Sequence, residues 1–282
     1  MKHFRIALCN EVVAALPFER QCALAAALGY DGLEVAPFTL SDDPATLSSA
    51  ARADLRRAAE REGIAITGLH WLLNAPAGLS ITSGDARVQQ KTRDHVAAMV
   101  DLCAELGGDI LVHGSPKQRA LGDAATPDAA RANAVALFRH AAERAGAAGV
   151  TYCIEPLSPI LTDFVTTIDE ARAIVDEIAM PALATMLDTC AAWSGEHEQP
   201  DALIRRHLPS GAIRHVHLND DNNRAPGQGA RGFAPVMRAL LDLDYRGVVG
   251  IEPFDYHPDG STAAARAIGY LQGLMETMEA RS

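Results

Sequence analysis

The sequence has few cysteines, no long apolar run and a deficit of positive charge, and each shortage excludes a class of protein. Its five cysteines among 282 residues form no CxxC pair, so neither a disulfide framework nor a structural zinc knuckle is expected. No stretch approaches the ~20 consecutive apolar residues that a transmembrane helix requires. The net charge of −11 repels a phosphate backbone, which disfavours nucleic acid as a partner.

The N-terminal segment also lacks the apolar stretch of a secretory signal. Residues 1–11 turn polar after a short apolar run that is typical of a first strand. This pattern predicts a cytoplasmic protein. The 48% share of hydrophobic residues is ordinary for a globular protein, and we expect one domain over residues 1–282.

What the sequence does contain is a regular alternation of strand-type and helix-type segments. Short apolar runs predict eight strands, at 4–9, 31–35, 64–70, 109–113, 150–155, 183–188, 212–218 and 247–252. Helical spacing of apolar residues predicts eight helices, at 17–29, 47–62, 86–106, 127–148, 167–179, 200–208, 233–243 and 262–279. Eight βα units in a chain near the ~250 residues typical of such folds predict a single-domain (β/α)8 barrel of the TIM type.

Four of the predicted strands end in a residue type that binds metal ions: Glu155, Asp188, His217 and Glu252. Their intervals of 33, 29 and 35 residues each match one βα unit. Because the C-terminal ends of barrel strands meet at one mouth, we expect the four side chains to converge on one divalent ion. Three carboxylates and one imidazole suit Mn²⁺ best, with Mg²⁺, Co²⁺ or Zn²⁺ as alternatives.

Each of these residues alone also has a structural explanation. A Leu-Asp-Thr run is typical of a helix N-cap, which would account for Asp188. His215 and His217 on one strand face would often be ordinary core histidines. The conjunction of four ligand types at one end of four strands favours the metal site over a barrel that keeps its shape without an ion.

Residues near the other strand ends are candidates for substrate contacts. Trp71 and Phe254 are candidates for stacking against an apolar face of a substrate, and packing at the barrel mouth explains them equally well. Lys117, Arg119 and Arg224 are candidates for binding a carboxylate or phosphate of the substrate, and for Lys117 and Arg119 a role as solvated surface residues is the simpler interpretation. The Gly-rich stretch 226–232 predicts a loop over the mouth. The candidates for binding hydroxyl groups are His70, His113, Asp220 and Arg224.

The four ligand-type residues, with the segment from His215 to Gly229, resemble the xylose isomerase-like barrel superfamily. The resemblance is to its branch of sugar phosphate isomerases and epimerases, which includes ketose 3-epimerases and inosose isomerases, and it covers almost the whole chain. It implies a metal-dependent isomerase or epimerase that acts on a small carbohydrate and forms a homo-oligomer, a dimer or tetramer. In similar enzymes the residues matching Glu155 and Glu252 bind the metal and transfer the substrate proton. Those matching Asp188 and His217 complete the coordination.

The implied chemistry is removal of a proton from a carbon next to a carbonyl, through an enediolate. A divalent ion stabilises the negative charge that develops on the sugar oxygens. A carboxylate on each side of the sugar can take the proton from one face and return it on the other, which is epimerisation. Return on the same face, to the neighbouring carbon, gives aldose–ketose interconversion, and the sequence leaves both outcomes open.

Two positions depart from the pattern of ketose 3-epimerases. Those enzymes carry a substrate-binding His three residues after the Asp ligand and a Glu six residues after the first Glu, where this chain has Ala191 and Leu161. Their arginine lies six residues after the ligand His, whereas Arg224 lies seven after His217. Each substrate hydroxyl left without a partner costs roughly 1–3 kcal/mol, so we predict poor turnover of free fructose, psicose or tagatose.

Three rival functions are weighed against this interpretation. A lyase or hydratase acting on 3-keto-glycosides would use the same metal and the same two carboxylates. An abasic-site endonuclease of the same superfamily would need more metal-binding histidines and a basic groove, which the negative charge opposes. A non-catalytic sugar-binding paralogue would not need two opposed bases such as Glu155 and Glu252.

Overall fold

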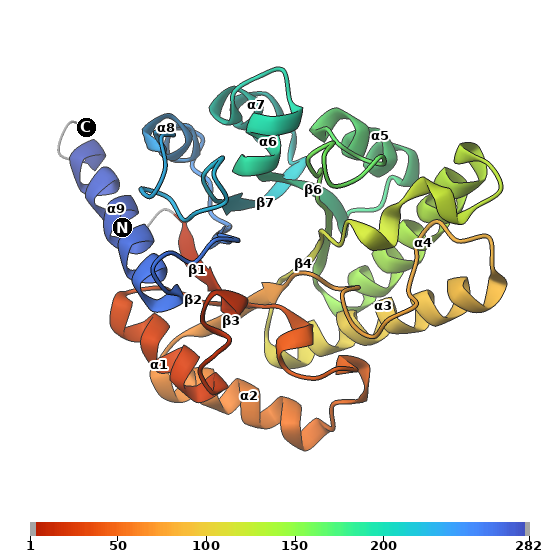
Figure 1. Ribbon diagram of the computed structural model, residues 1–282, viewed down its shortest axis with the longest axis horizontal. Helices are drawn as coiled ribbons and strands as arrows, with labels where there is room; N and C mark the ends of the chain where they lie inside the picture. The colour runs from red at the N-terminus through yellow and green to blue at the C-terminus, as the bar shows by residue number, and fades with distance from the viewer. Residues whose placement is uncertain (1–3, 280–282) are drawn as a thin grey trace.

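The computed structural model describes residues 4–279, and its strands close into a parallel barrel (Figure 1). The strands pair in chain order, and β1 also pairs with β8, with Arg5 opposite Val248 and Leu8 opposite Ile251. Their bounds are β1 Arg5–Cys9, β2 Gly32–Val35, β3 Ala65–Leu69, β4 Ile110–His113, β5 Thr151–Ile154, β6 Leu183–Asp188, β7 Ile213–Leu218 and β8 Val248–Ile251. The predicted (β/α)8 barrel and all eight predicted strands are confirmed.

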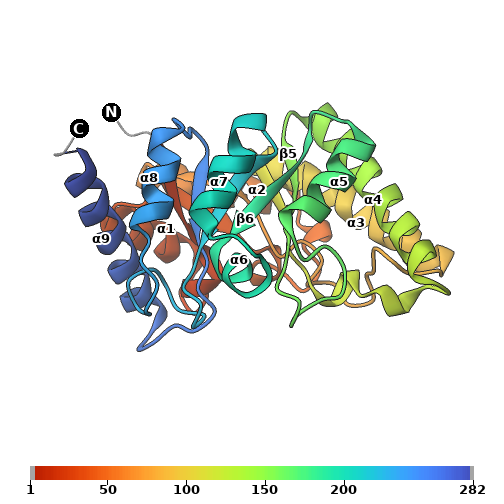
Figure 2. The same cartoon turned by 90° about the horizontal axis from the view of Figure 1, so that it is seen from above.

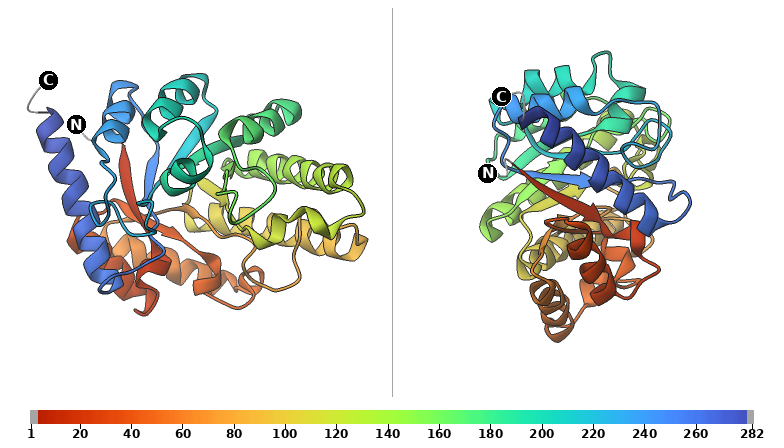
Figure 3. Two further views of the ribbon diagram at one scale, coloured as in Figure 1. Left: turned by 45° about the horizontal axis from the view of Figure 1, so that its top comes forward. Right: turned by 90° about the vertical axis from the view of Figure 1, so that its left-hand side faces the viewer.

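The α-helices of the described chain form a ring around the strands, as Figures 1 and 2 show. Their bounds are α1 Phe18–Leu28, α2 Ser49–Glu62, α3 Ala86–Leu106, α4 Pro127–Ala148, α5 Ile168–Ile178, α6 Thr189–Gly195, α7 Pro200–His207, α8 Ala234–Asp242 and α9 Gly260–Glu279. Eight match the predicted helices, and α6 was not predicted. Helix α9 lies beside α1, which closes the outer ring (Figure 3). No helix in the described part is long and apolar enough to cross a membrane.

Alternation along the strands separates the inside of the barrel from the layer between strands and helices. Ile110, Val112, Cys153, Ala184 and Met186 occupy alternate positions of β4, β5 and β6 and form a small buried cluster of their own. The residues between them join the larger core beneath the helices. Side chains two residues further along each strand therefore point inward at the C-terminal mouth.

Strand register brings the site residues of β6 and β7 side by side. Met186 lies opposite His215, and Asp188 lies opposite His217. Because both pairs sit on inward-facing positions, the last inward residue of each strand reaches the mouth at the same level.

Candidate active site

The structure brings Glu155, Asp188, His217 and Glu252 together at the C-terminal mouth of the barrel. One ligand-type atom from each lies within 4.8 Å of the others, and all four side chains are buried. They belong to the ends of β5, β6, β7 and β8, four neighbouring strands. Side chains this close can share one ion.

His217 is oriented by a carboxylate behind it. Its Nε2 lies 2.9 Å from Glu34 Oε1, while its Nδ1 faces the centre, 2.9 Å from Glu252 Oε2 and 4.0 Å from Glu155 Oε1. This buried Nδ1 has no hydrogen bond of good geometry to any residue between 4 and 279. An imidazole with one nitrogen held by a carboxylate and the other directed at a ligand cluster is the usual arrangement of a metal-binding histidine.

Asp188 both begins helix α6 and faces the centre. Its Oδ1 accepts a hydrogen bond from the backbone N–H of Ala191 at 2.7 Å, and its Oδ2 accepts one from Asn219 Nδ2 at 2.8 Å. Asn219 Nδ2 also donates to the Glu252 carbonyl at 3.0 Å. Each carboxylate oxygen has a second lone pair, so the N-cap role and a ligand role are compatible.

Two glycines give the buried side chains their room. A Cβ atom on Gly114 would lie 1.7 Å from Glu155 Oε2. A Cβ atom on Gly250 would lie 2.7 Å from His217 Cδ2 and 2.9 Å from Glu34 Oε2. No side chain fits at either position without displacing the residues of the centre.

Two carboxylates of the centre have raised pKa values. Burial, and then the charge of Glu252, raise the pKa of Glu155 well above its usual value. The same two causes raise the pKa of Asp188 to about 6. A divalent cation among these groups would offset both effects. The donor set of carboxylate oxygens and one imidazole nitrogen therefore fits a divalent ion such as Mn²⁺, Mg²⁺, Co²⁺ or Zn²⁺.

His70 lies beside the centre, close to two carboxylates. Its Nε2 is 2.8 Å from Glu11 Oε2 and 3.9 Å from Glu252 Oε1. Burial alone would lower its pKa, but the neighbouring carboxylates, Glu11 first, outweigh this and raise the pKa to about 9. The structure thus places the predicted substrate residue His70 beside the centre, although it does not line the pocket described next.

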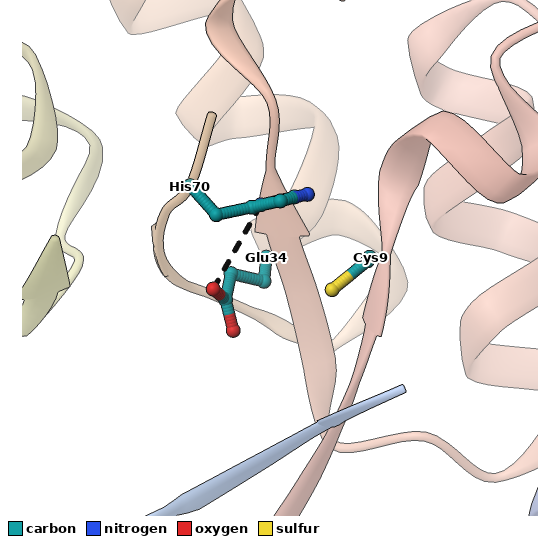
Figure 4. Close-up of side chains that lie close together, drawn as sticks. All are labelled: Cys9, Glu34 and His70. Carbon is teal, nitrogen blue, oxygen red and sulfur yellow. Dashed lines mark ion pairs between the residues drawn. The ribbon is translucent and has the colours of Figure 1, made fainter. Parts of the chain in front are cut away.

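Glu34, His70 and Cys9 converge from neighbouring strand ends, as Figure 4 shows. His70 Nδ1 lies 3.8 Å from Glu34 Oε1, and the second oxygen of Glu34 lies 2.8 Å from His215 Nε2. Burial, and then the charge of Glu34, raise the pKa of the Cys9 thiol well above its usual value. The thiol therefore stays protonated and is a poor ligand.

Trp71 and Phe254 lie at the mouth, where the sequence suggested them. Their rings meet edge to face with centroids 6.4 Å apart. Both line a pocket of about 400 Å³ that contains the carboxylates of Glu155, Asp188 and Glu252 at its inner end. Leu161 and Ala191, which stand where ketose 3-epimerases carry polar residues, line the same pocket.

His113 does not reach this pocket, so the expectation that it binds a hydroxyl does not fit its position. It is buried between β4 and α4, where its Nδ1 lies 2.7 Å from the Tyr152 hydroxyl and its ring packs edge to face on Phe138 at 5.1 Å. The physical reason is strand alternation, because Val112 faces inward and its neighbour must face the helices.

Asp220 and Arg224 shape the loop after β7 and do not line the pocket. The Asp220 carboxylate packs against Gly229, whose Cβ would lie 2.3 Å from Asp220 Cγ. Arg224 Nε donates to Asp255 Oδ2 at 2.7 Å. Asp221 and Asn223 line the pocket instead. The suggested roles of Asp220 and Arg224 in holding substrate therefore do not fit their positions.

The expectation that Arg119 is a solvated surface residue is wrong, because its side chain is fully buried. Its guanidinium donates to the carbonyl of Glu155 at 2.7 Å and to the carbonyl of His113. It thereby joins the ends of β4 and β5. Lys117 is exposed, as expected.

Four residues that hold the side chains of the centre in place were not predicted as site residues from the sequence: Glu11, Glu34, His215 and Asn219. Glu11, Glu34 and Asn219 stand at strand ends, and His215 stands one inward position before His217. Period-two alternation along each strand was the available signal, because it predicts which of these side chains face inward.

Comparisons with known proteins identify the family. The chain belongs to the xylose isomerase-like TIM barrel family, whose model matches residues 22–274. This confirms the resemblance inferred from the sequence.

The matched relatives include D-psicose 3-epimerases. The enzyme of Agrobacterium fabrum is 28% identical, with 81% of this chain and 76% of the relative covered. That of Enterocloster bolteae is 26% identical, with 81% and 74% covered. The solved structure of the D-psicose 3-epimerase with D-tagatose from Clostridium cellulolyticum has a TM-score of 0.82 at 19% identity, covering 96% of this chain and 99% of that chain. That similarity shows a shared fold.

Proposed function

We propose that the chain is a divalent-metal-dependent enzyme that epimerises or isomerises a sugar or sugar derivative. The observation that carries the proposal is the convergence of four buried ligand-type side chains within 4.8 Å, three of which line the inner end of a pocket. The names of the relatives support epimerisation in particular. They favour it over the alternative lyase or hydratase, which would use the same metal and the same two carboxylates.

Glu155, Asp188, His217 and Glu252 would hold the ion, most suitably Mn²⁺. A bound divalent ion supplies stabilisation of the negative charge that develops on the substrate oxygens during proton removal. Glu34 and Asn219 keep His217 and Asp188 in the orientation that this task requires.

Glu155 and Glu252 are the proposed acid and base. They enter the centre from β5 and β8, which are not neighbours in the barrel, and the proposal requires their carboxylates to face opposite sides of a bound sugar. One removes the proton beside the carbonyl to give an enediolate, and the other returns a proton to the opposite face. His70 Nε2 lies 3.9 Å from Glu252 Oε1, beside one of the two proposed acid–base groups.

Deuterium incorporation from buffered D₂O tests the proposal before any product is known. We expect proton NMR to show exchange at the carbon beside the carbonyl for at least one member of a panel of keto-sugars and their derivatives, with Mn²⁺ present. Glu252→Gln should lower the exchange rate by about 10²–10⁴-fold, because an amide cannot take the proton. Glu19→Gln on the exposed face of α1 is the matched control. Full exchange in Glu252→Gln would place the base elsewhere, and no exchange by the wild type on any panel member would overturn the proposal.

A further inference from the structure

Arg119 is the largest of the fully buried side chains in the described part of the chain. An arginine stays charged in proteins, and a buried charge is costly unless its donors are bonded. The guanidinium of Arg119 donates to two backbone carbonyls and to no carboxylate of residues 4–279. The position of this buried charge is therefore explained by those two carbonyls or not at all.

The two carbonyls hold the backbone on both sides of the Glu155 carboxylate. One is the carbonyl of Glu155 itself, which accepts Arg119 Nη1 at 2.7 Å. The other is the carbonyl of His113, which belongs to the peptide unit that leads into Gly114. A Cβ on Gly114 would lie 1.7 Å from Glu155 Oε2. Arg119 thus holds both the residue that carries the carboxylate and the backbone against which the carboxylate packs.

Glu155 needs such a contact because it stands one residue beyond the end of β5. Its own N–H donates to the His113 carbonyl at 3.3 Å, which is a long and weak bond. The carbonyl before it, that of Ile154, accepts Thr185 Oγ1 at 2.7 Å. In a parallel ladder the Glu155 carbonyl would accept a backbone N–H from the neighbouring strand. Because β4 has ended at this level, the guanidinium of Arg119 supplies a donor there.

The backbone on both sides of Arg119 is itself held by the loop after β3. The carbonyl of Gln118 accepts the N–H of Ile81 at 2.8 Å, and the carbonyl of Ala120 accepts Thr82 Oγ1 at 2.6 Å. The planar fork of a guanidinium presents its donors in a fixed geometry. A fork whose backbone is fixed can in turn fix the two carbonyls that it binds.

We propose that Arg119 is a positioning residue of the centre, because its guanidinium continues the β4–β5 ladder by one residue and thereby holds the Glu155 carboxylate in place. This inference rests on the proposed function, which assigns ion binding and proton transfer to Glu155. Arg119 does not line the pocket, so it acts through Glu155 and contacts no substrate.

Mn²⁺ affinity, measured by isothermal titration calorimetry, is the first test. Arg119→Met keeps the length of the side chain and removes its donors, so it should weaken Mn²⁺ binding by about 10-fold or more. The matched control is Arg52→Met, because Arg52 also donates to two loop carbonyls, those of Leu47 at 2.9 Å and Ala45 at 3.3 Å. The control should keep the wild-type affinity even if its Tm falls. Wild-type affinity in folded Arg119→Met would overturn the proposal.

Amide hydrogen exchange of the metal-free protein, followed by NMR, tests the same role without an ion or a substrate. In Arg119→Met the N–H of Glu155 should exchange about 10-fold faster or more. The N–H of Tyr152, which lies earlier on the same strand and donates to the Ala182 carbonyl at 2.8 Å, should keep its rate. Equal acceleration of both amides would show a general loss of stability, and no acceleration of either would show that Glu155 is held by other contacts. Both results overturn the proposal.

Arg119→Lys tests whether both donors of the fork are needed, since an ammonium group cannot reproduce the planar fork. For a keto-sugar that the wild type turns over, kcat at saturating Mn²⁺ should fall by about 10-fold in Arg119→Lys and further in Arg119→Met, while KM changes by less than about 3-fold. A wild-type kcat in Arg119→Lys would overturn the role of the fork. Failure of both variants to fold would assign Arg119 to the fold as a whole and overturn its role as a positioning residue.

The outcomes separate this inference from the proposed function. If the wild type binds no Mn²⁺ and exchanges no deuterium with any keto-sugar, the proposed function is contradicted and the amide exchange of Glu155 still decides the role of Arg119. If the wild type does both, and Arg119→Met matches it in Mn²⁺ affinity and in the exchange of Glu155, the role of Arg119 is overturned and the proposed function stands.

Discussion

Glu34 is the single residue on which the arrangement of imidazoles at the centre depends most. One carboxylate oxygen lies 2.9 Å from His217 Nε2 and the other 2.8 Å from His215 Nε2. Burial alone would raise its pKa, but the two imidazoles hold the pKa well below its usual value. Glu34 is therefore an anion that keeps Nε2 of His217 protonated and leaves Nδ1 free for an ion.

Replacing Glu34 by Gln should weaken Mn²⁺ binding by about 10–100-fold, the usual effect of losing a carboxylate that orients a ligand histidine. Isothermal titration calorimetry measures the affinity. Glu19→Gln, which makes the same change on the surface, should leave it unchanged. Wild-type affinity in Glu34→Gln would show that the orientation of His217 is set by other contacts.

Gly114→Ala tests the space around Glu155. The new Cβ would lie 1.7 Å from Glu155 Oε2, so the carboxylate must leave its position, and we expect deuterium exchange to fall by about 100-fold or more. Gly122→Ala is the matched control in the same loop, because its Cβ meets nothing within 4 Å. Unchanged exchange in Gly114→Ala would contradict the role of Glu155.

At the scale of elements, the strands were predictable and the connections after them were not. In β6, alternation makes Ala184, Met186 and Asp188 face inward, so a sequence pattern with a period of two locates the ligand. Helix α6 escaped prediction because its seven residues are too few for helical periodicity to show.

The loop after β7 shows the same limit. Its path depends on a contact between Asp220 and Gly229 and on the pair of Arg224 with Asp255. Arg224 and Asp255 lie 31 residues apart in the sequence, and no local pattern predicts either contact. The burial of Arg119 was unpredictable for the same reason, because its partners are backbone carbonyls at the ends of two strands.

Arg224→Ala tests that description of the loop. Arg224 pairs with Asp255 and does not line the pocket, so KM for a turned-over keto-sugar should change by less than about 3-fold. Because the ion pair is partly exposed, the free energy of unfolding should fall by no more than about 1 kcal/mol. Steady-state kinetics and chemical denaturation measure the two effects. A rise in KM of more than about 10-fold would show that Arg224 contributes to substrate binding.

At the scale of the whole molecule, several buried carboxylates lie at one end of the barrel. The chain as a whole has a net charge of −11. The closed ring of strands makes this arrangement possible, because β1 pairs with β8 and so residues from opposite ends of the sequence lie side by side. The cytoplasmic location and the dimeric or tetrameric state stay predictions.

Metal binding should stabilise the fold more at about pH 7.5 than at about pH 5. In the metal-free protein the pKa of Asp188 is raised to about 6 and that of Glu155 is raised well above its usual value. The folded state therefore holds these protons more tightly than the unfolded state, so their contribution to stability is present below about pH 4 and is lost as the pH rises through the folded-state values. An ion replaces the protons at the higher pH.

Differential scanning fluorimetry with and without Mn²⁺ measures this effect as a shift in Tm. The shift is compared, and not Tm itself, because groups remote from the centre change Tm with pH equally with and without Mn²⁺. Equal shifts at both pH values would contradict the assignment of these carboxylates to the ion.

The most direct test of the account is a titration of the metal-free protein with Mn²⁺, in which electron paramagnetic resonance measures free Mn²⁺. The account predicts one tightly bound ion per chain in the wild type and loss of that binding in Asp188→Ala/His217→Ala, while Glu19→Gln binds as the wild type does. Absence of tight binding in the wild type, or wild-type affinity in the double variant, would contradict it.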